Sequence, residues 1–292
     1  MIGDILDFRQ VGKLKSTYAD GLSAAADENG RVHTSFRQAL TATGRLSSIE
    51  PNLQNIPVKT ELGRELRKFF VAKDETYTLI DADYSQIELR ILAAISGDEA
   101  MIAAFRDGYD IHTATAMRVF GVSEKDVTIE LRKKAKAVNF GILYGMGDFS
   151  LASDLHITRA DARAYIDSYL GAYPKVRQYL EDVVHDAKRD GYVTTYFGRR
   201  RYIPELSSGK KMEVSFGERV AMNSPIQGTA ADIIKLAMVN TAKKLTSGGY
   251  DARLILQVHD ELIVESAKSC ADEVGRLLKA EMENAVSLSV PL

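Results

Sequence analysis

The chain has 292 residues, of which 45% are hydrophobic, enough for one large domain or for two or three subdomains. Its net charge of −2 excludes a histone-like mode of nucleic-acid binding, but not an enzyme with a local cationic cleft. The single cysteine, Cys270, excludes an intramolecular disulfide and is typical of a reducing compartment. Because the sequence has neither a signal-peptide core nor a run of about 20 apolar residues, we expect a cytoplasmic protein without a membrane span.

The N-terminal part of the chain predicts a helix followed by short extended segments. Apolar residues recur at three- and four-residue spacing over 2–22, a pattern that predicts an amphipathic helix. The polar cluster at 27–30 predicts a turn, and 32–38 a strand. Arg45 then lies in an extended loop, 41–48, among small hydroxyl residues. That setting suits contact with a nucleic-acid phosphate or minor groove, although a solvated loop arginine remains the alternative.

Residues 77–97 change from strand to helix periodicity, and Asp83 stands at the change. A carboxylate at the end of a strand can open a binding site. It can equally be the N-cap of the helix that follows. Ser85 and Glu88 also fit a capping box, which gives Glu88 a structural role of its own. These alternatives stay open until a second carboxylate is found.

The stretch 98–190 predicts several helices, and its most informative segment is 129–145. Arg132, Lys136 and Phe140 follow at four-residue steps and therefore form one stripe on a helix, which Gly145 should end. Two cations and an aromatic ring in a row can hold a polyphosphate and cover a base and sugar. The alternative is an ordinary charged helix face with a phenylalanine in the core.

Two further segments predict a hairpin and a long helix. Residues 194–206 suit a hairpin with Gly198 in its turn, whose arginines form a local positive patch or a charged strand edge. A long helix is expected from Phe216 to about Leu245, with an interruption near 223–228. It carries a polar stripe four residues apart that faces solvent or lines a groove: Arg219, Asn223 and Gln227.

The segment 254–265 contains two apolar runs on either side of His259, Asp260 and Glu261. The pattern predicts a β-hairpin with the polar triplet at its tip, in a sheet covered on at least one face. Two adjacent carboxylates at the end of a rigid element can bind a divalent cation, and a solvated turn is the alternative. The last segment, 271–285, predicts an amphipathic helix.

Several motifs, in their order along the chain, resemble those of family A DNA polymerases. The three polymerase motifs are similar to DYSQIELR at 83–90, RKKAKAVNFGILYG at 132–145 and QVHDELIVE at 257–265. Segments within 41–57 and 223–235 are similar to further parts of the family. At Val214 the family generally has an arginine, which puts one fingers-to-palm contact in doubt.

The resemblance implies an α+β fold shaped like a right hand, with an antiparallel palm sheet and helical fingers. It implies a remnant of a thumb helix at 1–22, a palm at 23–90 and 216–292, and fingers at 91–215. Most of the thumb and any exonuclease domain are not expected in these residues. On that ground we also expect weak, salt-sensitive duplex binding and distributive synthesis.

The resemblance further implies template-directed DNA synthesis, in which a primer 3′-hydroxyl attacks the α-phosphate of a dNTP. Two Mg²⁺ ions would be held by Asp83, Asp260 and the backbone carbonyl of Tyr84, with Glu261 in support. Lys136 would act as general acid for pyrophosphate. Because the resemblance supplies Asp260 as the second carboxylate, we expect Asp83 to be a metal ligand rather than a helix N-cap.

The same resemblance implies two partners, dNTPs and primer-template DNA, and it implies that the protein is a monomer. Glu88 would exclude a ribose 2′-hydroxyl. The other nucleotide-binding residues would be Arg132, Lys136, Phe140, Tyr144, Gln86 and His112. The DNA-binding residues would be Arg45, Gln54, Arg219, Asn223, Gln227 and His259.

Three alternatives to a DNA polymerase are considered. A single-subunit RNA polymerase shares the carboxylate and lysine motifs, but Glu88 argues against it because a ribonucleotide needs the space open. A fragment that binds primer-template or nucleotide without efficient turnover is the second. A metal-dependent phosphohydrolase built on His259 and Asp260 is disfavoured, because the five histidines are scattered along the sequence.

Overall fold

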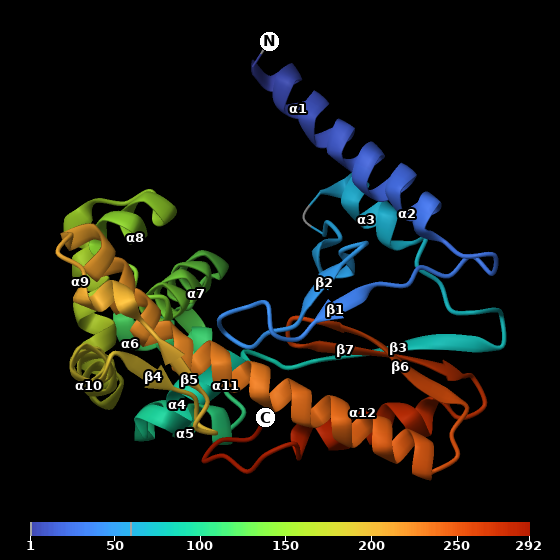
Figure 1. Ribbon diagram of the computed structural model, residues 1–292. Helices are drawn as coiled ribbons and strands as arrows, with labels where there is room; N and C mark the ends of the chain where they lie inside the picture. Colours follow the sequence, from blue (N-terminus) through green and yellow to red (C-terminus); the bar gives the residue numbers. More distant parts are fainter. Residues whose placement is uncertain (1, 59) are drawn as a thin grey trace. The chain divides into compact units, whose positions relative to one another are not determined.

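The structure, a computed structural model, describes residues 2–58 and 60–292 (Figure 1). The chain divides into two compact units. Unit 1 comprises the chain up to Asp83 together with Ala237–Met282, and unit 2 comprises Tyr84–Leu236 together with Glu283–Leu292. The fold is α+β with antiparallel sheets, as predicted. Within the described ranges, no helix combines the length and apolar character that crossing a membrane requires.

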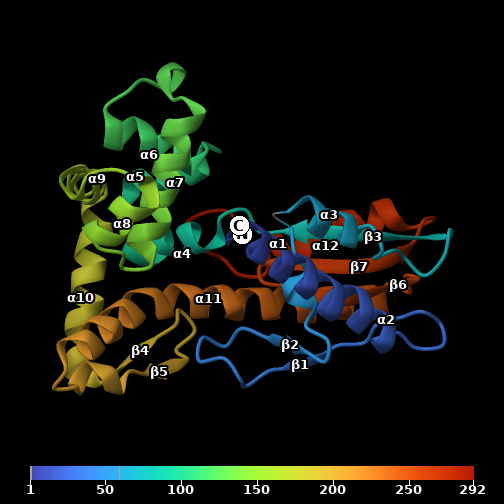
Figure 2. The same ribbon diagram turned by 90° about the horizontal axis from the view of Figure 1, so that it is seen from above.

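The centre of unit 1 is an antiparallel sheet of three strands in the order β3-β7-β6. Their bounds are Tyr77–Asp83 for β3, Ala252–Val258 for β6 and Glu261–Ala267 for β7. Helix α12, Ala271–Glu283, packs against this sheet (Figures 1 and 2) through Gly275, whose added Cβ would lie 3.8 Å from Ile80. The apolar runs of the sequence therefore form the predicted hairpin and its covered sheet.

The tip of that hairpin differs from the prediction in one respect. Only His259 and Asp260 form the turn, because Glu261 already pairs with Val258 as the first residue of β7. His259 adopts a left-handed backbone with φ of 56°, which a tight two-residue turn demands. Glu261 is thus fixed in the sheet rather than at the loop tip.

The N-terminal segment of unit 1 is helical, as predicted, and continues to Ala25. It consists of α1 Ile2–Lys13, a π-helical segment Leu14–Asp20 and α2 Gly21–Ala25. Met1, the first residue of the predicted range 1–22, lies outside the described residues. Helix α1 buries none of its described side chains, so its apolar positions are exposed. Tyr18 is buried, and its hydroxyl donates a hydrogen bond to Asn55 O at 2.7 Å.

Between this helix and the sheet lie short elements that support Gln54. Strands β1 Ser35–Arg37 and β2 Ser47–Ile49 pair antiparallel, and the 3-10 turn Leu53–Asn55 and helix α3 Glu61–Arg67 follow. The predicted turn at 27–30 is present, and the predicted loop at 41–48 ends at Leu46, because Ser47 and Ser48 belong to β2. Ser48 is fully buried, and its hydroxyl accepts a hydrogen bond from Leu53 N at 2.8 Å.

Unit 2 is the helix-rich part that the sequence predicts. Its helices before the hairpin are α4 Ile87–Ser96, α5 Glu99–Arg106, α6 Ile111–Phe120, α7 Ile129–Leu143, α8 Asp148–Leu155, α9 Arg159–Ala172 and α10 Pro174–Asp190. The apolar face of α4 forms much of the core. The C-terminal tail is tied to this core, since Arg90 Nη1 donates to Pro291 O at 2.6 Å and Arg106 Nε to Ser289 O at 2.9 Å.

The capping interpretations of Asp83 and Ser85 are wrong. Asp83 is the last residue of β3, and the N-cap of α4 is Gln86, which makes no side-chain cap hydrogen bond. The reason is the left-handed backbone of Gln86, with φ of 54°, which delays the start of the helix to Ile87. Ser85 and Glu88 therefore do not form a capping box.

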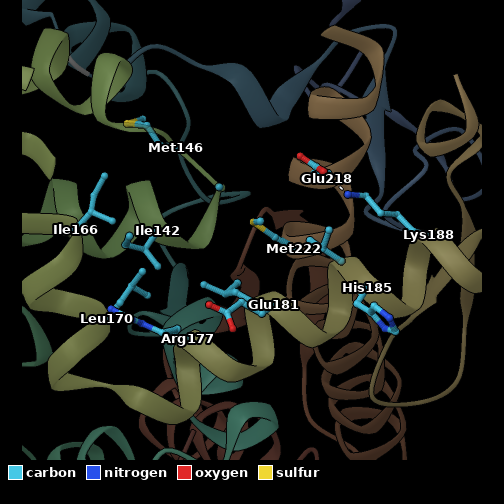
Figure 3. A pocket seen from close by; sticks show the side chains of 13 residues that line it. Ile142, Met146, Ile166, Leu170, Arg177, Glu181, His185, Lys188, Glu218 and Met222 are labelled. Atoms are coloured by element: carbon cyan, nitrogen blue, oxygen red, sulfur yellow. Dashed lines mark hydrogen bonds and ion pairs between the residues drawn. The ribbon is translucent and has the colours of Figure 1, made fainter. Parts of the chain in front are cut away.

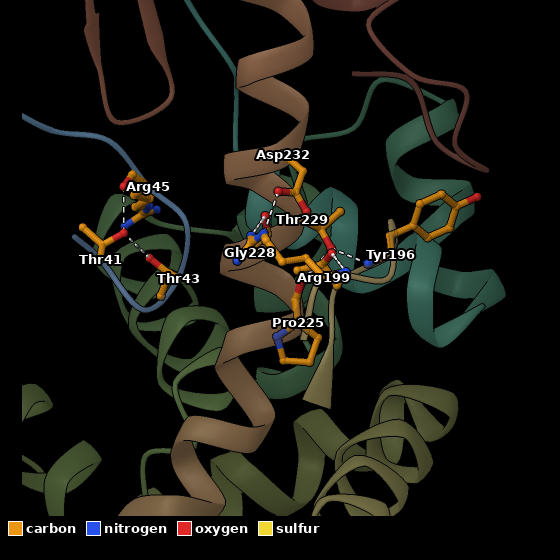
Figure 4. Close-up of polar contacts among 10 residues, drawn as sticks. Thr41, Thr43, Arg45, Tyr196, Arg199, Pro225, Gly228, Thr229 and Asp232 are labelled. Carbon is orange, nitrogen blue, oxygen red and sulfur yellow. Dashed lines mark hydrogen bonds and ion pairs between the residues drawn. The ribbon is translucent and has the colours of Figure 1, made fainter. Parts of the chain in front are cut away.

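The predicted interruption of the long helix near Pro225 is also wrong. Helix α11 runs over 37 residues, Lys211–Ser247, without a break. Pro225 removes one backbone donor. Two hydrogen bonds lie at this turn (Figure 4): within the helix the Thr229 hydroxyl donates to Pro225 O at 2.6 Å, and from outside it Arg199 Nη2 donates to Gly228 O at 2.9 Å.

Arg199 belongs to the hairpin that the sequence predicts at 194–206. Strands β4 Tyr192–Thr194 and β5 Arg200–Tyr202 pair antiparallel, and Gly198 in the connection has φ of 81°. Arg199 Nε also donates to Asp232 at 3.0 Å, and Tyr196 N donates to the Thr229 hydroxyl at 2.9 Å (Figure 4). The hairpin is thereby fixed to the proline-containing turn of α11.

Candidate active site

The acidic residues of unit 1 gather at one end of the three-stranded sheet. In the register of β3 with β7, Asp83 lies directly opposite Glu261, and directly opposed residues of an antiparallel pair have Cα atoms about 5 Å apart. Asp260 precedes Glu261 in the hairpin turn. Strand pairing therefore brings together two predicted acids that are far apart in sequence.

Asp81 is a further member of this acidic group, and the sequence analysis missed it. It lies two residues before Asp83 on β3, so both side chains are on the same face of the sheet. Burial, the charge of Asp81 and a hydrogen bond with Asp81 raise the pKa of Glu261 to about 7, and the charge of Asp83 adds to this. The D-x-D spacing within a predicted strand was the available signal.

A divalent cation fits the chemistry of this end of the sheet. Carboxylate oxygens are hard ligands, and Mg²⁺ is commonly bound through one or two carboxylates together with substrate phosphates. The described residues contain no group of three or more His, Cys, Asp or Glu side chains arranged to hold a metal ion.

Arg45 and His259 lie beside this acidic group. Arg45 Nη2 is 3.9 Å from Asp260 Oδ1, and the Thr41 hydroxyl shapes the arginine loop by donating to Arg45 O at 2.7 Å (Figure 4). Burial and the nearby charge of Arg45 lower the pKa of His259. The imidazole is therefore neutral at pH 7 and can both donate and accept hydrogen bonds.

Gln54 is held against the same hairpin by several hydrogen bonds. Its side-chain amide donates to Gln257 O at 3.1 Å and to Gln257 Oε1 at 3.0 Å. It also accepts a hydrogen bond from Ser48 N at 3.1 Å. A cavity of about 450 Å³ in unit 1 is lined by both Gln54 and His259, together with Lys13, Tyr18, Asn55, Ile56, Pro57, Val58 and Thr60.

Helix α7 of unit 2 presents the predicted cationic and aromatic stripe. Arg132 and Lys136 are exposed and Phe140 is half-buried. The Lys136 ammonium lies 6.0 Å from the centre of the Phe140 ring. The rings of Phe140 and Tyr144 are nearly parallel, at 16°, with centres 6.3 Å apart. The stripe therefore continues from the cations to two aromatic rings at the end of the helix.

Arg132 has a partner that sequence reasoning missed. Its Nε and Nη2 donate to the two carboxylate oxygens of Asp110, each at 2.8 Å. Asp110 is the N-cap of α6 and accepts a hydrogen bond from Thr113 N at 2.8 Å. The available signal was the spacing of Asp110 and Thr113, which is typical of an N-cap.

His112 is buried under the same stripe, with 2% of its surface exposed. The distance from its Nδ1 to the amide nitrogen of Asn139 is 3.2 Å, and Asn139 Oδ1 accepts from the Thr115 hydroxyl at 3.2 Å. With the Asn139 amide as donor, the His112 proton lies on Nε2. Burial lowers the pKa of His112 to about 4; the charge of Asp110 opposes this shift, and the charges of Arg132 and Lys136 add to it.

Glu88 and Tyr144 are hydrogen-bonded to each other within unit 2. The Tyr144 hydroxyl donates to Glu88 Oε2 at 2.9 Å, and Glu88 is 5% exposed. Tyr84 is buried, and burial raises the pKa of its hydroxyl. Gln86 is half-buried at the N-cap of α4. These residues lie on the segment that directly follows Asp83.

The polar stripe of α11 is present, with Arg219 exposed and both Asn223 and Gln227 half-buried. The side-chain amide nitrogen of Asn223 is buried and has no hydrogen-bond partner among the residues that the structure describes. A buried donor without a partner is rare in proteins. Val214, at the position where the family generally has an arginine, lies in the first turns of α11 and is half-buried.

A second cavity, of about 570 Å³, adjoins the C-terminal end of α7 in unit 2 (Figure 3). Its walls are largely apolar and come from α7, α9, α10 and α11. Residues that line it include Ile142, Met146, Ile166, Leu170, Val184 and Met222. Gly145 lies at its edge in a left-handed conformation with φ of 63°. None of the predicted site residues lines this cavity.

Comparison with known proteins assigns the family. The model of DNA polymerase family A matches residues 1–292, the whole of the chain. The chain belongs to this family. It is 53% identical over 293 residues to DNA polymerase I of Geobacillus stearothermophilus and 54% identical over 289 residues to that of Bacillus subtilis, covering 100% and 99% of the chain. In both comparisons it spans 33% of the relative's length, or about a third.

A solved structure from this family has the same fold. It is the polymerase domain of Pol1 from M. smegmatis, in complex with a DNA primer-template and dNTP. The TM-score is 0.93 and the sequence identity 46%, over 98% of this chain and 50% of that one. This similarity agrees with the α+β polymerase fold that the motifs predict.

Proposed function

We propose that this chain catalyses template-directed DNA synthesis. In this reaction the primer 3′-hydroxyl attacks the α-phosphate of a dNTP, and pyrophosphate leaves. The observation that carries the proposal is the register of β3 with β7, which pairs Asp83 with Glu261, the residue that follows Asp260 in the chain. Membership of DNA polymerase family A supports it, as do relatives named DNA polymerase I and the similar structure with primer-template and dNTP.

We propose that Asp83, Asp260 and the backbone carbonyl of Tyr84 hold two Mg²⁺ ions. Such ions, when bound, lower the pKa of the attacking hydroxyl and stabilise the charge on the leaving pyrophosphate. The raised pKa of Glu261 is due first to burial, and the negative charges of Asp81 and Asp83 add to it; a cation at this end of the sheet would offset that repulsion. Glu261 itself would support the site as a neighbour rather than as a bridging ligand.

The stripe on α7 supports binding of the incoming nucleotide. Arg132 and Lys136 would neutralise the triphosphate, and Lys136, whose ammonium is exposed, would donate the proton that pyrophosphate takes up. Phe140 would pack on the sugar and base, and Tyr144 would lie at the templating position. His112 and Gln86 would donate hydrogen bonds to phosphates, His112 through Nε2.

We propose two sets of residues for contact with the primer-template. One set is Arg45, Gln54 and His259, and the other is the polar stripe of α11: Arg219, Asn223 and Gln227. The partnerless amide of Asn223 supports its assignment, because a groove edge or phosphate offers the acceptor that the protein does not. Such contacts recognise the shape of a duplex more than its sequence.

We further propose the domain roles that the family implies. Residues 1–22 would be part of a thumb, 23–90 and 216–292 the palm, and 91–215 the fingers. The palm would therefore include the acidic end of the sheet, and the fingers would include α7. The chain would act as a monomer.

The test is incorporation of one labelled nucleotide into a primer-template in the presence of Mg²⁺. Wild type should extend the primer, and Asp260→Ala should lose at least about a thousandfold in rate, while binding of the duplex is retained. Asp272→Ala is the matched control, because it removes an exposed acid from α12. Equal rates for wild type and Asp260→Ala would refute the assignment, and duplex binding without extension by wild type would identify a binding fragment.

A further inference from the structure

The Asp110–Arg132 pair joins two helices that the proposed nucleotide site uses. Arg132 lies one turn from Lys136 on α7, and Asp110 begins α6, two residues before His112. The carboxylate contacts the guanidinium along its side edge, with Nε and Nη2 each 2.8 Å from a different oxygen. Two parallel hydrogen bonds of this kind fix the plane of the guanidinium as well as its position.

This geometry engages only one edge of the guanidinium. Nη1 and the second hydrogen of Nη2 form the other edge, which Asp110 does not use. A planar guanidinium has enough donors to bind a carboxylate on one edge and a phosphate on the other. The Arg132 side chain is 44% exposed, so the pairing does not bury it.

Asp110 is itself held firmly. Its Oδ2 accepts hydrogen bonds from Thr113 N at 2.8 Å and from the Thr113 hydroxyl at 2.7 Å. Burial acts to raise the pKa of Asp110, but hydrogen bonds from Arg132 and Thr113 outweigh burial and hold that pKa well below its usual range. The carboxylate is therefore ionised throughout the pH range in which an enzyme works.

We propose that Asp110 is a positioning residue for nucleotide binding, which orients the Arg132 guanidinium so that its opposite edge receives the triphosphate of the incoming nucleotide. The inference rests on the proposed function, since it assigns how Arg132 is prepared for that ligand. A carboxylate that merely occupied Arg132 and had to be displaced would have the opposite effect, because its removal would strengthen nucleotide binding.

The test begins with Asp110→Asn. Asparagine is as good an N-cap as aspartate, so α6 keeps its start, while the charge and one acceptor for Arg132 are lost. In steady-state incorporation of a single nucleotide, the KM for dNTP should rise about tenfold, whereas kcat should change less than about twofold. Asp148→Asn is the matched control, because it removes the Asp148–Arg159 pair from the same unit and leaves Arg132 intact.

The dependence on Arg132 is tested with a double-mutant cycle. Lysine keeps the positive charge but cannot form two parallel hydrogen bonds with the Asp110 carboxylate. In the Arg132→Lys background, Asp110→Asn should therefore change KM by less than about twofold. An unchanged or lowered KM in Asp110→Asn alone, or the same rise in both backgrounds, would overturn the inference.

A second measurement separates this inference from the proposed function. In an NMR spectrum of the wild-type chain, the Nε–H resonance of Arg132 should be protected from exchange, and Asp110→Asn should remove that protection. In the wild-type chain the protection should persist when dATP or inorganic tripolyphosphate is added in excess. Loss of the protected signal on addition of either would mean that Asp110 is displaced. If wild type incorporates no nucleotide, the proposed function fails, and this signal still decides the role of Asp110.

Discussion

The Tyr144 hydroxyl donates a hydrogen bond to the Glu88 carboxylate at 2.9 Å, which joins the end of α7 to the first turn of α4. Glu88 is 5% exposed, and its position is therefore defined. If Glu88 excludes a ribose 2′-hydroxyl, Glu88→Ala should admit ribonucleotides. The preference for dNTP over rNTP, measured as a ratio of kcat/KM, should fall about tenfold or more.

Two variants separate size from charge in this prediction. Glu88→Gln keeps the volume of the side chain and should retain most of the discrimination. Tyr144→Phe keeps the ring but removes the hydrogen bond, so discrimination should fall by less than in Glu88→Ala. Unchanged discrimination in Glu88→Ala would contradict the gate and restore the single-subunit RNA polymerase as an alternative.

His112 gives a prediction for pH. Burial lowers its pKa to about 4, below the value of about 6.5 for an unperturbed histidine. Because the unfolded chain binds the proton more readily, the stability that His112 contributes is complete above pH 6.5 and declines as the pH falls toward 4. An NMR titration of the imidazole should show a neutral ring at pH 5. A midpoint near 6.5 would contradict this.

The sequence predicts the elements of the site because their patterns are local. Alternating and continuous apolar runs define β3, β6 and β7, and four-residue spacing places Arg132, Lys136 and Phe140 on one helix face. The pairing of β3 with β7 then needs only an antiparallel sheet with one buried face. The acidic end of the sheet follows from these patterns together with the family motifs.

The side-chain partners could not be predicted in the same way. Asp110 is 22 residues from Arg132, and they meet because α6 packs on α7. The hydrogen bond from Arg199, on the preceding hairpin, to Gly228 O beside the proline-containing turn of α11 likewise joins residues far apart in sequence. The local rule that proline ends a helix fails here, because α11 stays helical on both sides of Pro225 although the proline nitrogen cannot donate to the carbonyl four residues before it.

Arg199 gives a prediction for stability. Its Nε binds Asp232 at 3.0 Å, and the other carboxylate oxygen of Asp232 is buried without a hydrogen-bond partner among the described residues. Arg199→Ala should therefore destabilise the fold by about 2 kcal/mol, as expected for lost hydrogen bonds to charged groups. Arg200→Ala removes only an exposed contact over the Tyr192 ring and should cost about 0.5–1 kcal/mol. Urea unfolding measures the free energy of unfolding of both variants. Equal decreases in Arg199→Ala and Arg200→Ala would refute the stabilising role of the Arg199 hydrogen bonds.

The last prediction concerns Gly145, which follows the cationic and aromatic stripe of α7. Its backbone has φ of 63°, and an added Cβ would lie 3.0 Å from both Arg219 Cγ and Met222 Sδ. Gly145→Ala therefore combines an unfavourable backbone conformation with close contact to two side chains of α11. We expect a loss of about 1–2 kcal/mol in the free energy of unfolding.

A glycine inside a helix is the matched control for this substitution. Gly171 lies in α9, and nothing is within 4 Å of the position that its Cβ would take. Gly171→Ala should stabilise the protein by about 0.5–1 kcal/mol, because alanine loses less conformational entropy in a helix. Opposite shifts of the urea midpoint in the two variants would support this account. A Gly145→Ala variant as stable as wild type would mean that the turn after α7 can adopt another conformation.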